Sequence, residues 1–191
     1  MKYRERFQSC LFNPTEEQIF ERDPLSAFSF YLSGRVNVLC TIADEIIENL
    51  DQGFSAVCIN GGRIDRAESL MWLWLLGAYE VVRTMHQAKQ CFSERLGGDL
   101  QRLKNQLAIV RMPAAKMEKP GVKRPVGSDR SPAGWDVPGR DLLVNDPEER
   151  ANVSARRILT EFDNLFCSIT SADVLGRHET QYPSGQCEPS R

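Results

Sequence analysis

The sequence has only two histidines, and its six cysteines never stand in a Cys-x-x-Cys pair. Structural zinc sites need four nitrogen or sulfur ligands at characteristic spacings, so the sequence predicts neither a metal centre nor a cofactor. The cysteines, two of which fall within apolar helical runs, are expected to be reduced thiols. This usage is typical of a cytoplasmic protein.

An excess of either charge is also missing. The chain has 24 Lys and Arg residues against 26 Asp and Glu residues, a formal net charge of -2. No overall positive field would therefore draw it to nucleic acid or to anionic lipid, although a local basic patch is compatible with this balance.

Long hydrophobic runs are absent as well. The basic N-terminus is not followed by an apolar run of signal-peptide length, and the most apolar stretch, residues 69–85, contains Glu80 and Arg83. This stretch is too short and too polar for a bilayer core of about 30 Å, so we expect no leader and no membrane partner. The glycine pair in Asn60-Gly61-Gly62-Arg63 precedes a helix but lacks the Gly-Lys-Ser/Thr ending of a phosphate loop, so it predicts a turn.

The residues that are present indicate a helical domain. Of 191 residues, 41% are hydrophobic and 26% are charged, which is ordinary for one globular domain. Asp23-Pro24 is a typical helix start, and apolar residues at steps of three and four predict a first helix over residues 25–50. Its inward stripe is Phe28, Tyr31, Leu32, Val36, Leu39, Ile42, Ala43, Ile46 and Leu50.

A second helix is predicted over residues 65–95, where one apolar position recurs every seven residues. Residues 72–76 are apolar on all sides of this helix, so neighbouring helices or a second subunit must cover them, and we expect a homodimer. The recurring positions are Ile64, Met71, Ala78, Met85 and Phe92.

A third helix is predicted after Gly97-Gly98, with Asp99 as its cap and Pro113 forcing its end. Residues 117–147 then alternate prolines and glycines, which predicts an irregular insertion. Within it, Trp135 and residues 142–144 are expected to pack, in a short hairpin. Asp146-Pro147 begins a fourth helix that runs to Ile169. Its inward stripe is Val153, Ile158, Leu159, Phe162, Leu165, Phe166 and Ile169.

These elements predict an all-α fold, an up-and-down bundle of four main helices with a long Pro/Gly-rich insertion between helices three and four. The domain spans residues 1–175, with the irregular insertion at 117–147. Residues 176–191 show no periodicity and are expected to form a flexible tail.

Arg111 and Lys116 stand five positions apart at the end of the third predicted helix. This segment resembles the arginine and histidine pair, separated by four to six residues, of the HEPN superfamily of helical nucleotide-binding domains. Members are also bundles of about four helices, often dimeric. The resemblance implies RNA or another anionic ligand as a partner, and a site in which the arginine stabilises phosphorane charge and the histidine moves protons.

Lys116 occupies the position of that histidine. A free lysine amine has a pKa of about 10.4 and exchanges protons poorly near neutral pH. The resemblance therefore favours a non-catalytic interaction or ligand-binding module over an enzyme. The alternative is a metal-independent ribonuclease or toxin with an altered Arg/Lys pair. The structural reading, two solvated cations beside a proline, stays open.

Glu80 and Arg83 lie three residues apart in the second predicted helix, so they can pair on an exposed face or join Arg111 in a polar cluster. The ligand-binding candidates are Glu80, Arg83, Arg111 and Lys116. His86 has no evident partner and is expected to pack at a rim. A cationic stretch with Trp135 suits single-stranded nucleic acid or a solvated loop. Its cations are Lys116, Lys119, Lys123, Arg124 and Arg130.

Overall fold

The structure is a computed structural model that describes residues 1–7, 12–55, 58–116, 118, 125, 133–144 and 153–178. In these ranges the chain is mostly helical, with one small two-stranded sheet, which confirms the all-α prediction. The four long helices are α4 (Phe30–Gly53), α5 (Gly61–Gln87), α6 (Glu94–Lys116) and α7 (Ala155–Cys167).

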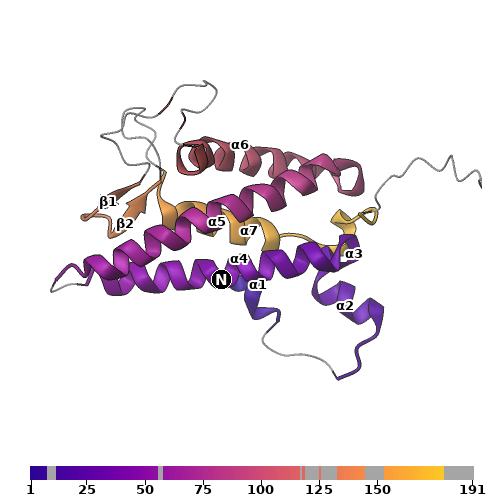
Figure 1. Cartoon of the computed structure of the whole chain (residues 1–191). Helices are drawn as coiled ribbons and strands as arrows, with labels where there is room; N and C mark the ends of the chain where they lie inside the picture. The colour runs from indigo at the N-terminus through magenta and orange to yellow at the C-terminus, as the bar shows by residue number, and fades with distance from the viewer. Residues whose placement is uncertain are drawn as a thin grey trace, which may run out of the picture.

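The four long helices run alternately up and down, as predicted (Figure 1). Helix α5 packs between α4 and α6, and α7 contacts both α4 and α6, which closes the bundle. Three short helices lie at the N-terminal side, and two 3-10 turns flank the long helices. These short elements are α1 (Lys2–Glu5), α2 (Glu16–Arg22), α3 (Pro24–Phe28) and the turns Lys89–Cys91 and Ser171–Asp173.

Aromatic side chains from α5 and α7 fill the core. The Trp74 ring packs edge-on against Phe162 with centroids 5.1 Å apart, and its indole N–H donates to the Leu39 carbonyl at 3.1 Å. The predicted apolar seam is confirmed, because all five positions that recur every seven residues are buried. Most of the fourth predicted stripe is also buried, namely Ile158, Leu159, Phe162, Leu165, Phe166 and Ile169.

The prediction of one helix over residues 25–50 is wrong at Ser29. This residue is extended (φ -164°, ψ 116°), and its hydroxyl accepts a hydrogen bond from the Leu32 N–H at 3.3 Å. A serine in this role accepts a hydrogen bond from one of the backbone N–H groups that lack a partner in the first turn of a helix. Helix α3 therefore ends before Ser29, and α4 begins after it. The break changes the phase of the helical face, and Tyr31, predicted to point inward, is 70% exposed.

The boundary between the second and third helices also differs from the prediction. Helix α5 ends at Gln87, and Gly97-Gly98 lie inside α6 rather than before it. Phe92 is extended and forms an isolated bridge with Val174, while the Ser93 hydroxyl accepts from the Leu96 N–H at 3.3 Å. This cap starts α6 early, and together with the packing of α6 on α5 it offsets the cost of about 1 kcal/mol for each interior glycine.

Pro113 does not end α6, which continues to Lys116. A proline inside a helix removes one hydrogen bond, here the bond that would reach the carbonyl of Ile109. Ile109 is 43% exposed, so water can reach the helix surface at this point. Because Pro113 stands in the last turn, few bonds depend on it, and the predicted stop is wrong.

The predicted hairpin is confirmed. Strands β1 (Gly134–Asp136) and β2 (Asp141–Leu143) pair antiparallel with Trp135 opposite Leu142. Helix α7 begins only at Ala155, where the Ser154 hydroxyl caps the Arg157 N–H at 3.0 Å. Val153 is not helical and is only partly buried, so a continuous helix through this residue is wrong. The predicted start at Asp146-Pro147 lies outside the described residues.

The segment after α7 returns to the bundle. The Leu175 N–H donates to the Cys91 carbonyl at 2.8 Å, and the His178 N–H donates to the Phe28 carbonyl at 2.9 Å. The first residues of the predicted tail, 176–178, are thus attached to the body, and residues 179–191 lie outside the described part.

Two further observations concern the described residues alone. None of their helices combines the length and the apolar character needed to cross a membrane. Their four cysteines, Cys40, Cys58, Cys91 and Cys167, are free thiols, as predicted. Cys10 and Cys187 lie outside these residues.

Asp173 joins the end of the chain to the start of α6. Its carboxylate accepts from the Ser93 hydroxyl at 2.6 Å, from the Thr170 hydroxyl at 2.8 Å and from the Arg95 guanidinium at 2.5 Å. Burial alone would raise the pKa of Asp173, but the hydrogen bonds from Arg95, Ser93 and Thr170 outweigh it. The pKa of Asp173 is therefore held well below its usual range.

The hydrogen bonds of Asp173 to Ser93, Thr170 and Arg95, which we call the Asp173 clamp, predict that the stability of the fold is sensitive to acid. Since the pKa of Asp173 is lower in the folded than in the unfolded chain, the clamp stabilises fully above about pH 4 and is lost as the pH falls below that value. Urea unfolding from pH 7 downwards should show a steeper loss of stability for the wild type than for Asp173→Asn, which should already be less stable at pH 7. Glu161→Gln, in an exposed ion pair, is the control, and equal slopes for the wild type and Asp173→Asn would contradict the assignment.

Candidate functional site

Three of the four predicted ligand-binding residues meet between α5 and α6. The Glu80 carboxylate lies 2.7 Å from one guanidinium nitrogen of Arg83 and 3.7 Å from one of Arg111. Arg83 also donates through Nε to the same carboxylate at 2.9 Å. The polar cluster expected from the sequence therefore forms, with one carboxylate between two cations.

Arg111 is the most enclosed member of this cluster. Its guanidinium carbon lies 4.7 Å from the centroid of the Tyr79 ring, a distance suited to a cation-π contact. The Arg111 side chain is 23% exposed, against 45% for Arg83 and 47% for Glu80. Its Nε is buried and has no hydrogen-bond partner among the described residues. The stacked ring and the helix surface thus fix the Arg111 guanidinium, while Arg83 stays open to solvent.

Lys116 does not belong to this cluster. Helix α6 continues without interruption from Arg111 to Lys116, and five residues turn an α-helix by about 140°. The two side chains therefore leave different faces of the helix, and Lys116 is exposed. The common pocket expected for the guanidinium at 111 and the amine at 116 is not formed.

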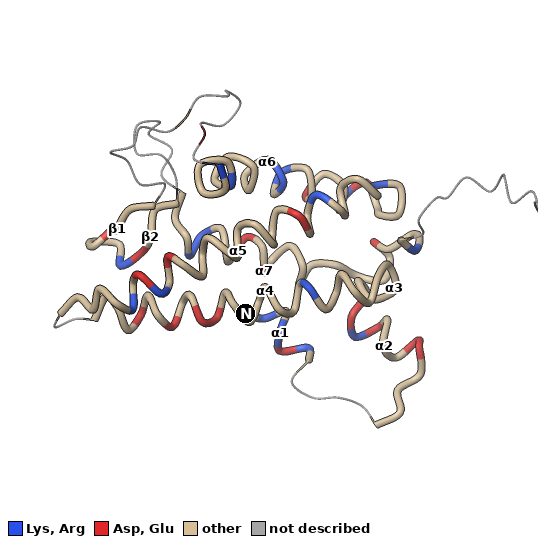
Figure 2. The backbone as a smooth tube through the Cα atoms, viewed as in Figure 1, with Lys and Arg blue, Asp and Glu red and all other residues tan. Residues whose placement is uncertain are grey.

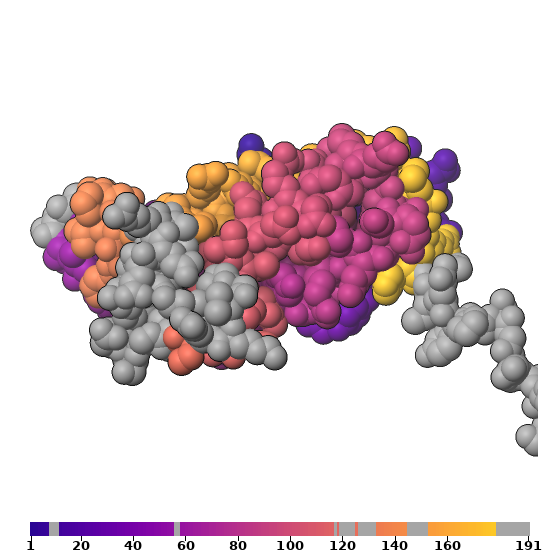
Figure 3. Space-filling model, turned by 90° about the horizontal axis from the view of Figure 1, so that it is seen from above, coloured from indigo at the N-terminus to yellow at the C-terminus, as the bar shows by residue number. Residues whose placement is uncertain are grey.

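His86, which was expected to pack at a rim without a partner, and Lys104, which the sequence did not single out, extend the cluster along α5 and α6. Lys104 Nζ lies 3.3 Å from His86 Nδ1 and donates to Gln101 at 3.3 Å. On α5, Tyr79, Arg83 and His86 follow one another at steps of four and three, so they share a face. We call Tyr79, Arg83, His86, Lys104 and Arg111 the basic row. Figure 3 shows the surfaces of α5 and α6 next to each other on the upper face of the molecule.

The basic row has a net positive charge. Arg83, Arg111 and Lys104 are cationic, and Glu80 is the acid placed between the two arginines. The antiparallel register of α5 and α6 brings these residues together across a connection of a few residues. The spacing of Tyr79, Arg83 and His86 in the sequence could have indicated their shared face on α5. The α6 residues that lie opposite them depend on where α6 begins, and Gly97-Gly98 hides that start in the sequence.

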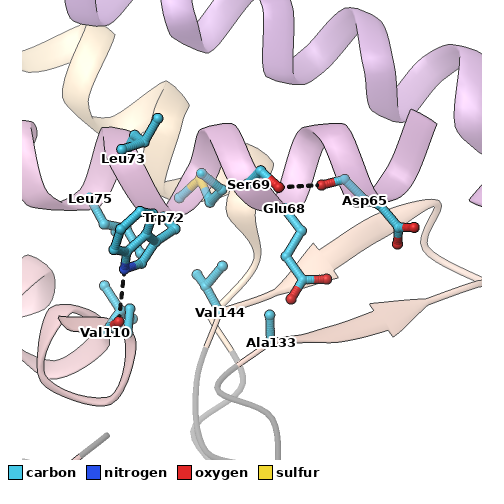
Figure 4. Close-up of a pocket in the computed structure, with 11 residues that line it drawn as sticks. Asp65, Glu68, Ser69, Trp72, Leu73, Leu75, Val110, Ala133 and Val144 are labelled. Atoms are coloured by element: carbon cyan, nitrogen blue, oxygen red, sulfur yellow. Dashed lines mark hydrogen bonds between the residues drawn. The ribbon is translucent and has the colours of Figure 1, made fainter. Parts of the chain in front are cut away.

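A separate groove of about 570 Å³ lies where α5, the end of α6 and the hairpin meet (Figure 4). Its walls are mainly apolar and include Met71, Leu75 and Val110. The Trp72 indole N–H donates to the Ala114 carbonyl at 2.9 Å. Ala114 stands in the last turn of α6, where carbonyls lack helical partners, so the Trp72 side chain caps this end of the helix.

Two acids stand at the same groove. Asp65 is exposed, and the Glu68 carboxyl points toward Ala133 and Val144 (Figure 4). Burial, followed by the nearby charge of Asp65, raises the pKa of Glu68. The groove thus combines apolar walls with negative charge, the opposite of the basic row on the same helix.

The remaining sequence candidates have structural roles or lie outside the described residues. The Asn60 side chain accepts from the Arg63 N–H at 3.2 Å, so Asn60-Gly61-Gly62 starts α5. The Trp135 ring meets Phe54 edge-on, with centroids 6.5 Å apart. The described residues contain no group of three acidic, histidine or cysteine side chains placed to hold a metal ion. The insertion cations Lys119, Lys123, Arg124 and Arg130 lie outside the described part.

The chain matches no known protein family, and no curated protein or solved structure matches it.

The Trp72 cap predicts a local effect on α6. Replacing Trp72 by phenylalanine keeps an aromatic ring but removes the donor to the Ala114 carbonyl. We expect Trp72→Phe to lower the free energy of unfolding by about 1 kcal/mol and to speed amide hydrogen exchange in the last turn of α6. Val137→Ala, an apolar residue of the hairpin that is 47% exposed, as Trp72 is, is the control for a general surface effect. Unchanged exchange in Trp72→Phe would refute the capping role.

Proposed function

We propose that the chain is a non-catalytic helical interaction module of HEPN-like type that binds an anionic ligand at the basic row and works as a homodimer. The observation that carries the proposal is the fixed guanidinium of Arg111, held on Tyr79 and beside Glu80, with Arg83 exposed next to it. A preset guanidinium beside a second, solvent-facing one is suited to phosphate or carboxylate oxygens.

The absence of catalysis is proposed from the position of Lys116. Proton transfer at one phosphate requires the basic group to lie within hydrogen-bond reach of the reacting atoms. Lys116 leaves α6 on a different face from Arg111, so the two residues do not converge on one ligand. A metal-independent ribonuclease of HEPN type remains the second candidate. One observation favours it: His86 lies one turn from Arg83 and 3.3 Å from Lys104, so an imidazole stands beside the basic row.

Binding is tested with a fluorescein-labelled single-stranded RNA as the anionic probe. Fluorescence anisotropy should give a dissociation constant that rises about tenfold in Arg83→Ala and weakens with salt, because the contact is electrostatic. Arg102→Ala, also on α6 but paired with Asp99, is the matched control and should bind as the wild type does. Equal binding by Arg83→Ala and wild type would reject the basic row as the ligand site.

Catalysis is tested by incubating the same RNA with the full chain and chelator and analysing its length. The module predicts intact RNA. Cleavage that is lost in both Arg111→Ala and Lys116→Ala would establish the altered Arg/Lys pair instead. Cleavage that persists in Lys116→Ala but is lost in His86→Ala would assign the imidazole as the proton-transfer group.

Homodimerisation is supported by the apolar side chains that the bundle leaves uncovered on α4 and α5. Tyr31 is 70% exposed, Val38 and Leu73 are each 51% exposed, and Trp72 is 47% exposed. The all-round apolar stretch of the second helix was the reason to expect a second subunit, and Trp74 and Leu75 in it are buried by the bundle itself. Light scattering after size-exclusion chromatography at micromolar concentration should return twice the chain mass of 21.7 kDa. A clean monomer would reject the dimer.

A further inference from the structure

A shallow groove of about 520 Å³ runs between α4 and α5 on the face that the remaining helices leave open. Figure 1 shows these two helices side by side at the front of the molecule, with α7 behind them. The middle of the groove is apolar, with Val38 and Ile42 from α4 and Leu73, Gly77 and Val81 from α5. The helices approach closely here, since a Cβ added to Gly77 would lie 2.9 Å from Leu39 Cδ2.

Two outward stripes border this groove and extend it. On α4, residues 31, 35, 38, 42 and 45 follow at steps of four and three, so they lie on one helix face. On α5, residues 66, 73, 77, 80 and 84 follow at steps of seven, four, three and four, so they also share one helix face. At 1.5 Å per residue, the stripe on α4 is about 20 Å long and the stripe on α5 about 27 Å long, enough for several turns of a facing helix pair.

The charges on these stripes alternate at the four corners of the apolar strip. At one end, Arg35 of α4 and Glu80 of α5 line the groove. At the other end, Glu45 of α4 lies 2.9 Å from Arg66 of α5. The signs are therefore plus and minus at one end, and minus and plus at the other. Figure 2 shows acidic residues gathered along the second half of α4.

This arrangement is complementary to itself. A two-fold axis in the plane of the face and across the helices lays α4 on the partner's α4, so that position 35 faces position 45. A two-fold axis along the groove lays α4 on the partner's α5, so that position 35 faces position 80. In both cases every positive corner meets a negative one, and the apolar strips meet in the middle. A dimer with two-fold symmetry brings the same surface of both subunits together, so this surface has to be complementary to itself.

We propose that the α4–α5 face is the surface on which a second copy of this chain docks, with Val38 and Leu73 at the apolar centre and Arg35, Glu45, Arg66 and Glu80 at the charged corners. The inference rests on the proposed homodimer and adds its interface. Both proposed surfaces use α5, and Glu80 belongs to both, because it lines the groove toward α4 and also pairs with Arg83 and Arg111 of the basic row.

The interface is tested by sedimentation equilibrium of the full chain. Val38→Glu should raise the dimer dissociation constant about 100-fold or more, because a carboxylate would be buried against apolar groups without a partner. Ile109→Glu makes the same change, from an exposed apolar residue to a carboxylate, on the surface of α6. It is the matched control and should dimerise as the wild type does. Circular dichroism of both variants checks that the helices are intact.

The outcomes separate the dimer from its interface. A wild-type monomer at high micromolar concentration overturns both. A wild-type dimer that Val38→Glu leaves intact, or that Ile109→Glu weakens equally, overturns only the docking face.

The corners are tested by charge reversal. Arg35→Glu should weaken the dimer about tenfold by placing like charges together. Restoration by the additional change Glu45→Arg shows that α4 faces the partner's α4, and restoration by Glu80→Arg shows that α4 faces the partner's α5. If neither change restores the dimer, the proposed charge pairing is refuted.

Discussion

Helix α5 has to satisfy two neighbours at once, and the rest of the structure depends on this constraint. It packs between α4 and α6, so one side buries Trp74 against α4 and α7 while another carries Tyr79 and Glu80 to Arg111 on α6. A helix in this central place needs apolar residues around most of its circumference. The tryptophan-rich stretch is a consequence of this position, and the parts of it that no neighbour reaches become candidate surfaces.

The same constraint separates the two proposed activities in space. The edge of α5 toward α6 gathers positive charge around a stacked guanidinium, and the edge toward α4 is an apolar strip with charges at its corners. Because the helix between them is packed on the core, each edge is held in a fixed orientation. An anionic ligand and a second copy of the chain would therefore engage two different faces of one rigid helix, with Glu80 between them.

Periodicity in the sequence predicted the bundle and most of its buried positions, because the hydrophobic effect imposes the 3.6-residue repeat wherever a helix faces a core. It failed where local preference and tertiary contacts disagree. Gly97-Gly98 and Pro113 are poor helix formers, yet the Ser93 cap and the packing of α6 on α5 keep them helical. The reverse occurs at Ser29, where a strong cap interrupts a run that is apolar enough to continue.

The helix boundaries also determined which site residues could be predicted from the sequence. Glu80, Arg83 and Arg111 were predictable, since two share a helix face and the third lies on the next helix. The divergence of Arg111 from Lys116 follows only from a helix that continues through Pro113, and the approach of Lys104 to His86 follows only from an α6 that begins before its glycines.

The glycine pair of α6 has a consequence for the order of folding. Two adjacent glycines next to its first turn leave this end with little intrinsic tendency to form a helix, and its stabilising contact, from Ser93 to Asp173, spans 80 residues of chain. Closing so long a loop is slow compared with helix formation. The start of α6 should therefore become ordered late, after α7 has docked, even though the rest of α6 can pair early with its sequence neighbour α5.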